Sequence, residues 1–144
     1  MIEITPFRPA DYDEVMALWQ TTEGLTLREA DSRDAVLLYL LRNPGLSFVA
    51  RQEGVLVGAV LGGTDGRRGY LQHLAVASTH RGQGIGRALT ERVIHAFAAM
   101  GVVKVHLMVR RENAKARTFW EHLGWVARDD VLLMSHADST APNA

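Results

Sequence analysis

The 144-residue sequence contains no cysteine. Disulfides, thiolate metal sites and a covalent intermediate on a cysteine sulfur are therefore excluded. It also lacks a dominant sign of charge, because 16 acidic residues balance 16 basic ones. Without a net field the protein has no general attraction for nucleic acid or for an anionic membrane, and we expect neither as a partner. Any charged ligand must be recognised locally.

No apolar run reaches the length of a membrane-spanning helix, and residues 2–5 alternate apolar and polar side chains. These features favour a cytoplasmic protein. The five histidines other than His73 are not spaced as metal ligands, and no metal site is expected. A chain of this length forms one domain with its own core and has room for one functional site.

Apolar periodicity predicts four helices, which begin near Asp11, Asp31 or Ser32, Ile85 and Asn113. It also predicts short strands over residues 2–7, 46–52, 55–62, 70–76, 102–109, 125–128 and 131–136. Turn residues at 53–54 and 65–69 join three of these strands into an antiparallel meander. The helix between 70–76 and 102–109 makes those two strands parallel.

The most informative segment is a turn in which three glycines alternate and which opens directly into a long amphipathic helix. It consists of Arg81, Gly82, Gln83, Gly84, Ile85, Gly86 and Arg87. Without Cβ atoms, backbone N–H groups can converge on an anion, and the helix start adds free donors and a positive dipole end. This pattern indicates phosphate binding. A helix start tightened by glycines for packing alone is the simpler alternative.

Two well-known phosphate motifs do not fit this turn. In the dinucleotide fingerprint a third glycine would stand where this chain has Arg87. A Walker A loop requires Gly-Lys-Ser/Thr after four intervening residues, and the chain has no such run.

In order along the chain, three segments resemble the GNAT acetyltransferase family. They are Leu74-Ala75-Val76, then 81–86 with the family's Arg/Gln-x-x-Gly-x-Gly/Ala motif, then 113–125 with Asn-x-x-Ala-x-x-Phe-Trp-x-x-x-Gly-Trp. The resemblance extends to about His136. It implies one α/β domain over residues 1–136, and the small, polar residues 137–144 predict a disordered tail. The mixed sheet would have about six to seven strands, a meander followed by a splayed parallel pair, flanked by about four helices.

By the same resemblance the co-substrate is acetyl-CoA. The turn over residues 81–87 would hold its pyrophosphate, and the backbone of Leu74, Ala75 and Val76 would hydrogen-bond its pantetheine arm like an added strand. Three residues would flank the far end of that arm: Asn113, Phe119 and Trp120. The last two also share the apolar stripe of their helix, so core packing is an equal explanation for them.

The resemblance leaves the acid and base of the reaction open. Many family members carry a tyrosine, proposed to protonate the leaving thiolate, where this chain has Trp120. An indole N–H is no useful acid near neutral pH, so the thiolate would leave without one. His73 is the candidate base, because histidine titrates near neutral pH and this residue adjoins the cofactor strand; a structural histidine is the alternative. Glu23 and Glu29 are the fallback candidates to bind the amine or relay its proton, and Tyr12, Tyr39 and Tyr70 rank below them. With Asp31 and Asp34 these two glutamates form an acidic cluster, which either attracts a cationic acceptor or is simply a solvated face.

We therefore expect an N-acetyltransferase that transfers an acetyl group from acetyl-CoA to a primary amine, on a small molecule or peptide, by direct attack in a ternary complex. The alternative is a non-catalytic acyl-CoA-binding sensor or interaction module of the same fold, supported by the missing tyrosine. A homodimer is also open. Arg67 and Arg68 beside Asp65 are either solvated turn residues or helpers for an acidic acceptor.

Overall fold

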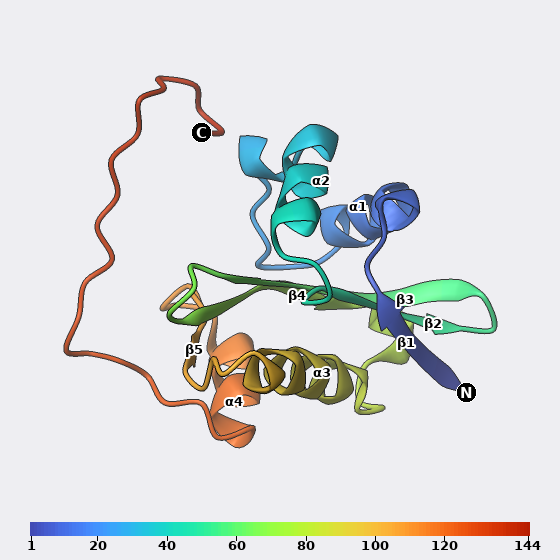
Figure 1. Cartoon of the computed structure of the whole chain (residues 1–144). Helices are drawn as coiled ribbons and strands as arrows, with labels where there is room; N and C mark the ends of the chain where they lie inside the picture. The colour runs from blue at the N-terminus through green and yellow to red at the C-terminus, as the bar shows by residue number, and fades with distance from the viewer.

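The computed structural model describes residues 1–144, and its centre is one five-stranded sheet (Figure 1). The strands lie in chain order; the first four are antiparallel and the last pair is parallel. They are β1 (Ile2–Pro6), β2 (Phe48–Gln52), β3 (Val55–Thr64), β4 (Gly69–Val76) and β5 (Val105–His106). The predicted meander and the predicted parallel pair are confirmed.

Four α-helices flank the sheet, as expected: α1 (Tyr12–Gln20), α2 (Arg33–Arg42), α3 (Ile85–Ala99) and α4 (Ala114–His122). Three 3-10 turns accompany them: η1 (Pro9–Asp11), η2 (Glu29–Asp31) and η3 (Ser78–His80). Figure 1 shows α1 and α2 on one face of the sheet and α3 and α4 on the other. The helices therefore divide the core into two layers.

Each layer has its own apolar cluster. Under α3, the side chains of Leu89, Val93 and Phe97 are completely buried and recur at the spacing of one helix face. On the opposite face, Val15 and Trp19 of α1 are buried against the sheet. Full burial of such a side chain contributes about 1.5–3 kcal/mol, so the two clusters fix the helices on the sheet.

Strand β4 is irregular at His73. This residue has a φ of 53°, and the register with β3 shifts there, so that two residues of β4 face one residue of β3. A bulge of this kind bends the strand. Before the bulge, β4 pairs with β5 only through Gly69 and Tyr70. The second half of β4 therefore has a strand partner on one side only, which is the splay expected from the sequence.

The predicted count of six to seven strands is wrong, because the structure has five. Within 102–109 only Val105 and His106 pair, and no backbone hydrogen bond joins 125–128 to 131–136, where a hairpin was expected. A two-residue β5 offers too short a ladder for further strands to extend. In addition, residues 131–134 form a continuous apolar run instead of an alternating one, and all four side chains are exposed.

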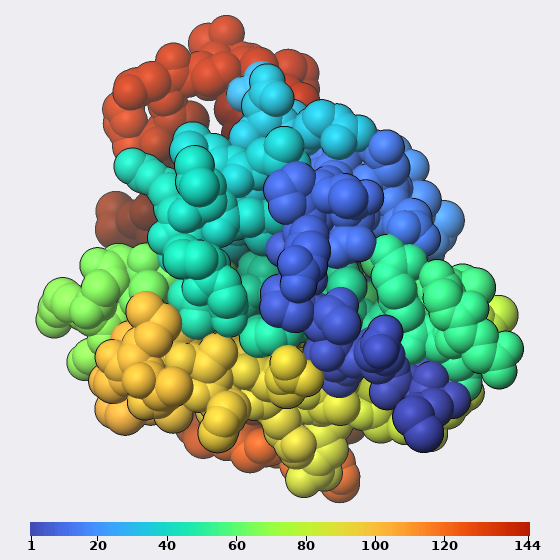
Figure 2. All heavy atoms as spheres, turned by 45° about the vertical axis from the view of Figure 1, so that its right-hand side comes forward, coloured from blue at the N-terminus to red at the C-terminus, as the bar shows by residue number.

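The C-terminal segment returns to the N-terminal half of the chain. The Glu29 N–H donates to the Asn143 carbonyl at 2.8 Å, and the Arg28 guanidinium donates to the Pro142 carbonyl at 3.1 Å. Figure 2 shows this segment in red beside the cyan residues that lead into α2. Disorder of residues 137–144 stays a prediction. None of the helices has the length and apolar character that a membrane crossing requires.

Candidate active site

The glycine-rich turn presents a row of free backbone donors. Gly82 and Gly84 have φ angles of 78° and 82°, a region that residues with a Cβ rarely adopt, and Gly84 is the N-cap of α3. None of the N–H groups of residues 81–87 donates to a protein acceptor. At the positive end of a 15-residue helix, these donors form a suitable site for an anion.

The two arginines of the turn already have partners. Arg81 donates from Nε to the Val76 carbonyl at 3.2 Å and pairs through Nη1 with Glu23 at 3.1 Å. Arg87 pairs with Glu91 at 3.0 Å, one helical turn away. All these charged groups are exposed, and exposed pairs contribute only about 0–1 kcal/mol. Both arginines are therefore available to a phosphate that offers a stronger interaction.

The open edge of β4 leads from this turn toward α4. Leu74 and Val76 point to the α3 face and Ala75 to the α1 face, while β3 pairs with the strand on its other side. The start of α3 lies close by, because a Cβ on Gly86 would be 3.2 Å from Phe119 Cζ and 3.7 Å from Leu74 Cδ2. The structure thus brings the predicted cofactor residues of three segments together.

Helix α4 forms the wall opposite that edge. Its N-cap is Asn113, whose Oδ1 accepts from the Ala116 N–H at 3.1 Å. A Cβ on Gly24 would lie 2.6 Å from Asn113 Nδ2, so the loop between α1 and η2 passes directly over the start of α4. Further along α4, Trp120 is only 8% exposed and makes edge contacts with the rings of Phe119 and Trp125, at 4.9 and 5.2 Å between centroids.

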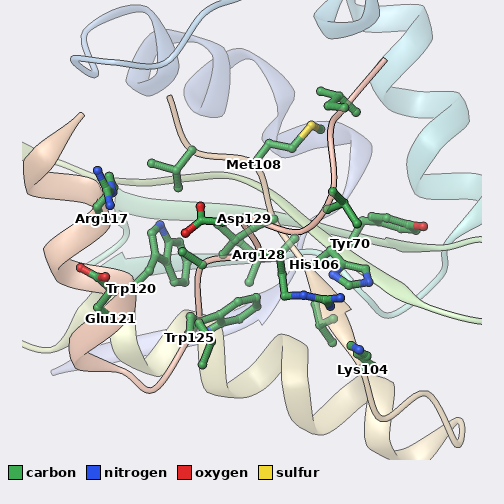
Figure 3. Close-up of a pocket in the computed structure, with 18 of the residues that line it drawn as sticks. Tyr70, Lys104, His106, Met108, Arg117, Trp120, Glu121, Trp125, Arg128 and Asp129 are labelled. Carbon is green, nitrogen blue, oxygen red and sulfur yellow. The ribbon is translucent and has the colours of Figure 1, made fainter. Parts of the chain in front are cut away.

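A cavity of about 790 Å³ opens where β4 and β5 separate (Figure 3). Its lining comes from β4, β5, α4 and the irregular segment 125–133. Figure 3 shows Trp120 on one side of it and Tyr70 on the other. The volume suits a small molecule, which binding cavities of a few hundred to a thousand Å³ usually enclose.

The sequence pattern of the Acetyltransferase (GNAT) family matches residues 12–125. The chain belongs to this family. An acetyltransferase of Sodalis glossinidius is 36% identical over 133 residues, which cover 92% of this chain and 93% of the relative.

Solved structures agree with this family membership. Ard1 from Thermoplasma volcanium superposes with a TM-score of 0.78 at 25% identity, over 87% of this chain and 82% of Ard1. The PaiA N-acetyltransferase from Thermoplasma acidophilum in complex with coenzyme A has the same fold, with a TM-score of 0.81 at 18% identity, over 90% and 92% of the two chains.

In this acetyltransferase, His73 lies on the α1 face of β4 and is held from two sides. Its Nε2 is 2.8 Å from Asp31 Oδ1, and its ring packs edge-on against Trp19, 5.0 Å between centroids. The Trp19 indole N–H also donates to the His73 carbonyl at 3.2 Å, at the bulge. These contacts fix both the imidazole and the strained backbone of this residue.

The charge state of Asp31 decides which nitrogen of His73 carries the proton. Burial alone would raise the pKa of Asp31, but hydrogen bonds from His73 and from the Arg28 N–H outweigh it and lower the pKa below its usual value. The ionised carboxylate only accepts hydrogen bonds, so Nε2–H must be the donor. Nδ1 is then left as the basic nitrogen of the ring.

The two predicted acceptor residues are separated by the fold. Glu23 pairs with Arg81 and therefore lies beside the phosphate turn. Glu29 begins η2, is exposed, and bonds through its backbone to the C-terminal segment. Neither lines the cavity, and His73 does not line it either. No group of three or more His, Asp or Glu side chains is placed to hold a metal ion.

Two residues of the site were missed or underrated from the sequence. Asp31 was considered as a helix cap or as part of an acidic cluster, yet Ser32 caps α2 by accepting from the Ala35 N–H at 3.3 Å. The partner of Asp31 is His73, 42 positions away, and no local pattern signals such a pair. Tyr70 lines the cavity although it was ranked below the histidine as a chemical group.

Proposed function

We propose that this protein transfers the acetyl group of acetyl-CoA to a primary amine by direct attack in a ternary complex. One observation carries the proposal: the free N–H groups of residues 81–87 lie next to the half of β4 that lacks a second strand partner. A diphosphate followed by an extended amide-bearing arm matches these two features in order. The fold shared with the coenzyme A complex of PaiA supports this placement.

When bound, acetyl-CoA supplies the acetyl group as a thioester. The protein contributes position: residues 81–87 hold the phosphates, Leu74 to Val76 align the arm, and Phe119 and Trp120 close the far side. Free backbone N–H groups of β4 near the bulge also stabilise the oxyanion that forms at the carbonyl. Asn113 fixes the start of α4 through its Oδ1, and its Nδ2 stays available as a donor to the far end of the arm.

A primary amine with a pKa of about 10.4 arrives as an ammonium ion, so its nitrogen loses one proton to solvent before the attack and a second as the amide forms. Its nitrogen attacks the carbonyl carbon, the carbon–sulfur bond breaks, and Nδ1 of His73 takes the nitrogen's second proton. Because His73 does not line the cavity, we place one water molecule between the two nitrogens. Asp31 keeps the imidazole in the tautomer that can accept this proton. The thiolate leaves unprotonated and takes its proton from water, with the Trp120 N–H able to donate a hydrogen bond to the sulfur.

The test has two parts on the purified protein. Calorimetry with coenzyme A should show binding that weakens as salt increases, because phosphates meet exposed arginines. Incubation with acetyl-CoA and a panel of primary amines should release free thiol only when an amine is present, with mass spectrometry showing the acetylated amine.

The alternative function, a non-catalytic acyl-CoA sensor, has one observation in its favour: Trp120 occupies the wall of the cavity where a phenol would act as an acid. The same two measurements separate the alternatives. Tight coenzyme A binding without thiol release on any amine would favour the sensor. Absence of coenzyme A binding by the folded protein would refute both.

A further inference from the structure

The cavity beside Trp120 is strongly basic. Five cationic side chains line it, against two carboxylates, those of Glu121 and Asp129. The cations are Arg68, Lys104, Arg111, Arg117 and Arg128. A pocket with this excess attracts anions and repels ligands that carry only positive charge.

Four of the five cations form no salt bridge, although Lys104 lies near Asp130, whose pKa is lowered mainly by the hydrogen bond from Arg128 and to a smaller extent by Lys104. Only Arg128 is paired, through two contacts of 3.1 Å with Asp130. Arg117 instead donates to the backbone carbonyl of Arg111 at 3.3 Å, near the start of α4. Cations that line one cavity without carboxylate partners favour a ligand that carries an anionic group. The observation therefore points to an anionic group on whatever occupies the cavity.

The phosphates of the cofactor are not that group. Their proposed site is at residues 81–87, beyond the C-terminal end of β4, whereas the cavity is lined by Tyr70 and Gln72 near the start of that strand. Between Tyr70 and Val76 the strand advances about 20 Å at 3.3 Å per residue. The basic cavity is thus at the thioester end of the cofactor arm, where the acceptor must enter.

Charged groups of both signs line the cavity. Figure 3 shows Arg117, Trp120 and Glu121 on the α4 side and Lys104, His106 and Tyr70 on the strand side, with Arg128 and Asp129 between them. A ligand with one cationic and one anionic end can satisfy both kinds of group. Its amine would face the carboxylates near Trp120, and its anionic end would face the unpaired Lys104 and Arg68.

We propose that the acceptor is a small amine that also carries a carboxylate, as in an amino acid, and that Arg68, Lys104, Arg111 and Arg117 select it against polyamines. This proposal rests on the proposed acetyl transfer. Lys104 and Arg68 bind the carboxylate, Arg111 and Arg117 add to the positive potential of the cavity, and an acceptor with only ammonium groups meets net repulsion there.

The test uses pairs of acceptors that differ by one carboxylate: L-lysine with 1,5-diaminopentane, and L-ornithine with 1,4-diaminobutane. For each pair, kcat/KM of amine-dependent thiol release is measured on the full chain. We expect the member with the extra carboxylate to exceed its partner by at least about tenfold, the value of one hydrogen bond to a charged group.

Equal or faster turnover of the decarboxylated members would overturn the acceptor class but leave the proposed function intact. Turnover of none of the four, while other amines are acetylated, would overturn the acceptor class as well. If no amine releases thiol at all, the proposed function fails first, and calorimetry with coenzyme A then shows whether the protein still binds its cofactor.

Charge-reversal variants locate the effect. Lys104→Glu and Arg117→Glu should each raise KM for the favoured carboxylate acceptor about fivefold or more, with coenzyme A affinity unchanged. The matched control is Arg67→Glu, because this exposed arginine neighbours Arg68 but does not line the cavity. It should change KM by less than about twofold. Equal effects of all three variants would show general electrostatics instead of a carboxylate site and would overturn the proposal.

Discussion

Replacing Asp31 by alanine removes one hydrogen bond that ties the segment before α2 to the sheet and one that caps the η2 turn. Oδ1 is 2.8 Å from His73 Nε2 and Oδ2 is 2.9 Å from the Arg28 N–H. The carboxylate side chain is only 8% exposed. Hydrogen bonds to a charged group contribute about 1.5–3 kcal/mol each, and loss of the buried charge relieves some desolvation, so we expect a net loss of about 2–4 kcal/mol.

Urea unfolding followed by tryptophan fluorescence measures this loss, because the Trp19 ring lies 5.0 Å from the imidazole of His73. A loss of that size corresponds to a fall in Tm of about 4–16 °C for a domain of this length. The control is Asp34→Ala, which removes an exposed carboxylate from the first turn of α2 and should cost less than about 1 kcal/mol. If the two variants unfold at the same urea concentration, the pair with His73 does not stabilise the fold.

The pH dependence gives an independent check. The folded-state pKa of Asp31 is lowered, so its stabilising effect is fully present above the unfolded-state pKa of about 3.9 and is lost as pH falls through the folded value. The difference in free energy of unfolding between the wild type and Asp31→Ala should be constant above about pH 5 and shrink below about pH 4. A difference that grows toward acid pH would contradict the lowered pKa.

Four other changes test the site and its surroundings. Trp120→Phe removes the indole N–H and should lower kcat less than about tenfold, since a true general acid contributes about a hundredfold or more; steady-state kinetics decides. Gly84→Ala places a Cβ at a φ of 82° and should cost about 1–2 kcal/mol in urea unfolding and weaken coenzyme A binding in calorimetry. Tyr39→Phe removes a buried hydroxyl that has no partner and should leave stability unchanged or raise it by up to about 1 kcal/mol; in the wild type, ultraviolet titration should find the pKa of Tyr39 raised by burial to about 12. Glu23→Gln frees Arg81 from an exposed pair, so stability should fall by less than about 1 kcal/mol while coenzyme A affinity holds or improves; weaker binding would mean that the pair orders the turn.

Local patterns predicted the elements that form through short-range contacts. The helix over Ile85–Ala99 follows from apolar residues at one-face spacing, and the turn at Glu53-Gly54 follows from its composition. Both residues of that turn have positive φ angles, as a tight hairpin requires. The cap at Asn113 was also predicted correctly, because a cap depends on the next three residues only.

The predicted strands over 125–128 and 131–136 do not form, because strand pairing depends on residues that are far apart in the sequence. Residues 125–136 have suitable composition, yet a strand forms only where a neighbour offers a ladder, and β5 offers two residues. The bulge at His73 illustrates the same limit. Nothing around it in the sequence marks the shift of register, which follows from how β4 packs between β3 and α1.

By itself, the sequence determined the order of the elements, the glycine turn before α3 and the family, because these depend on residue types at fixed spacing. Only the tertiary structure decided that Asp31 holds His73, that Glu23 meets Arg81, and that four unpaired cations surround one cavity. These groups come from segments tens of residues apart, and their distances are set by the packing of helices on the sheet.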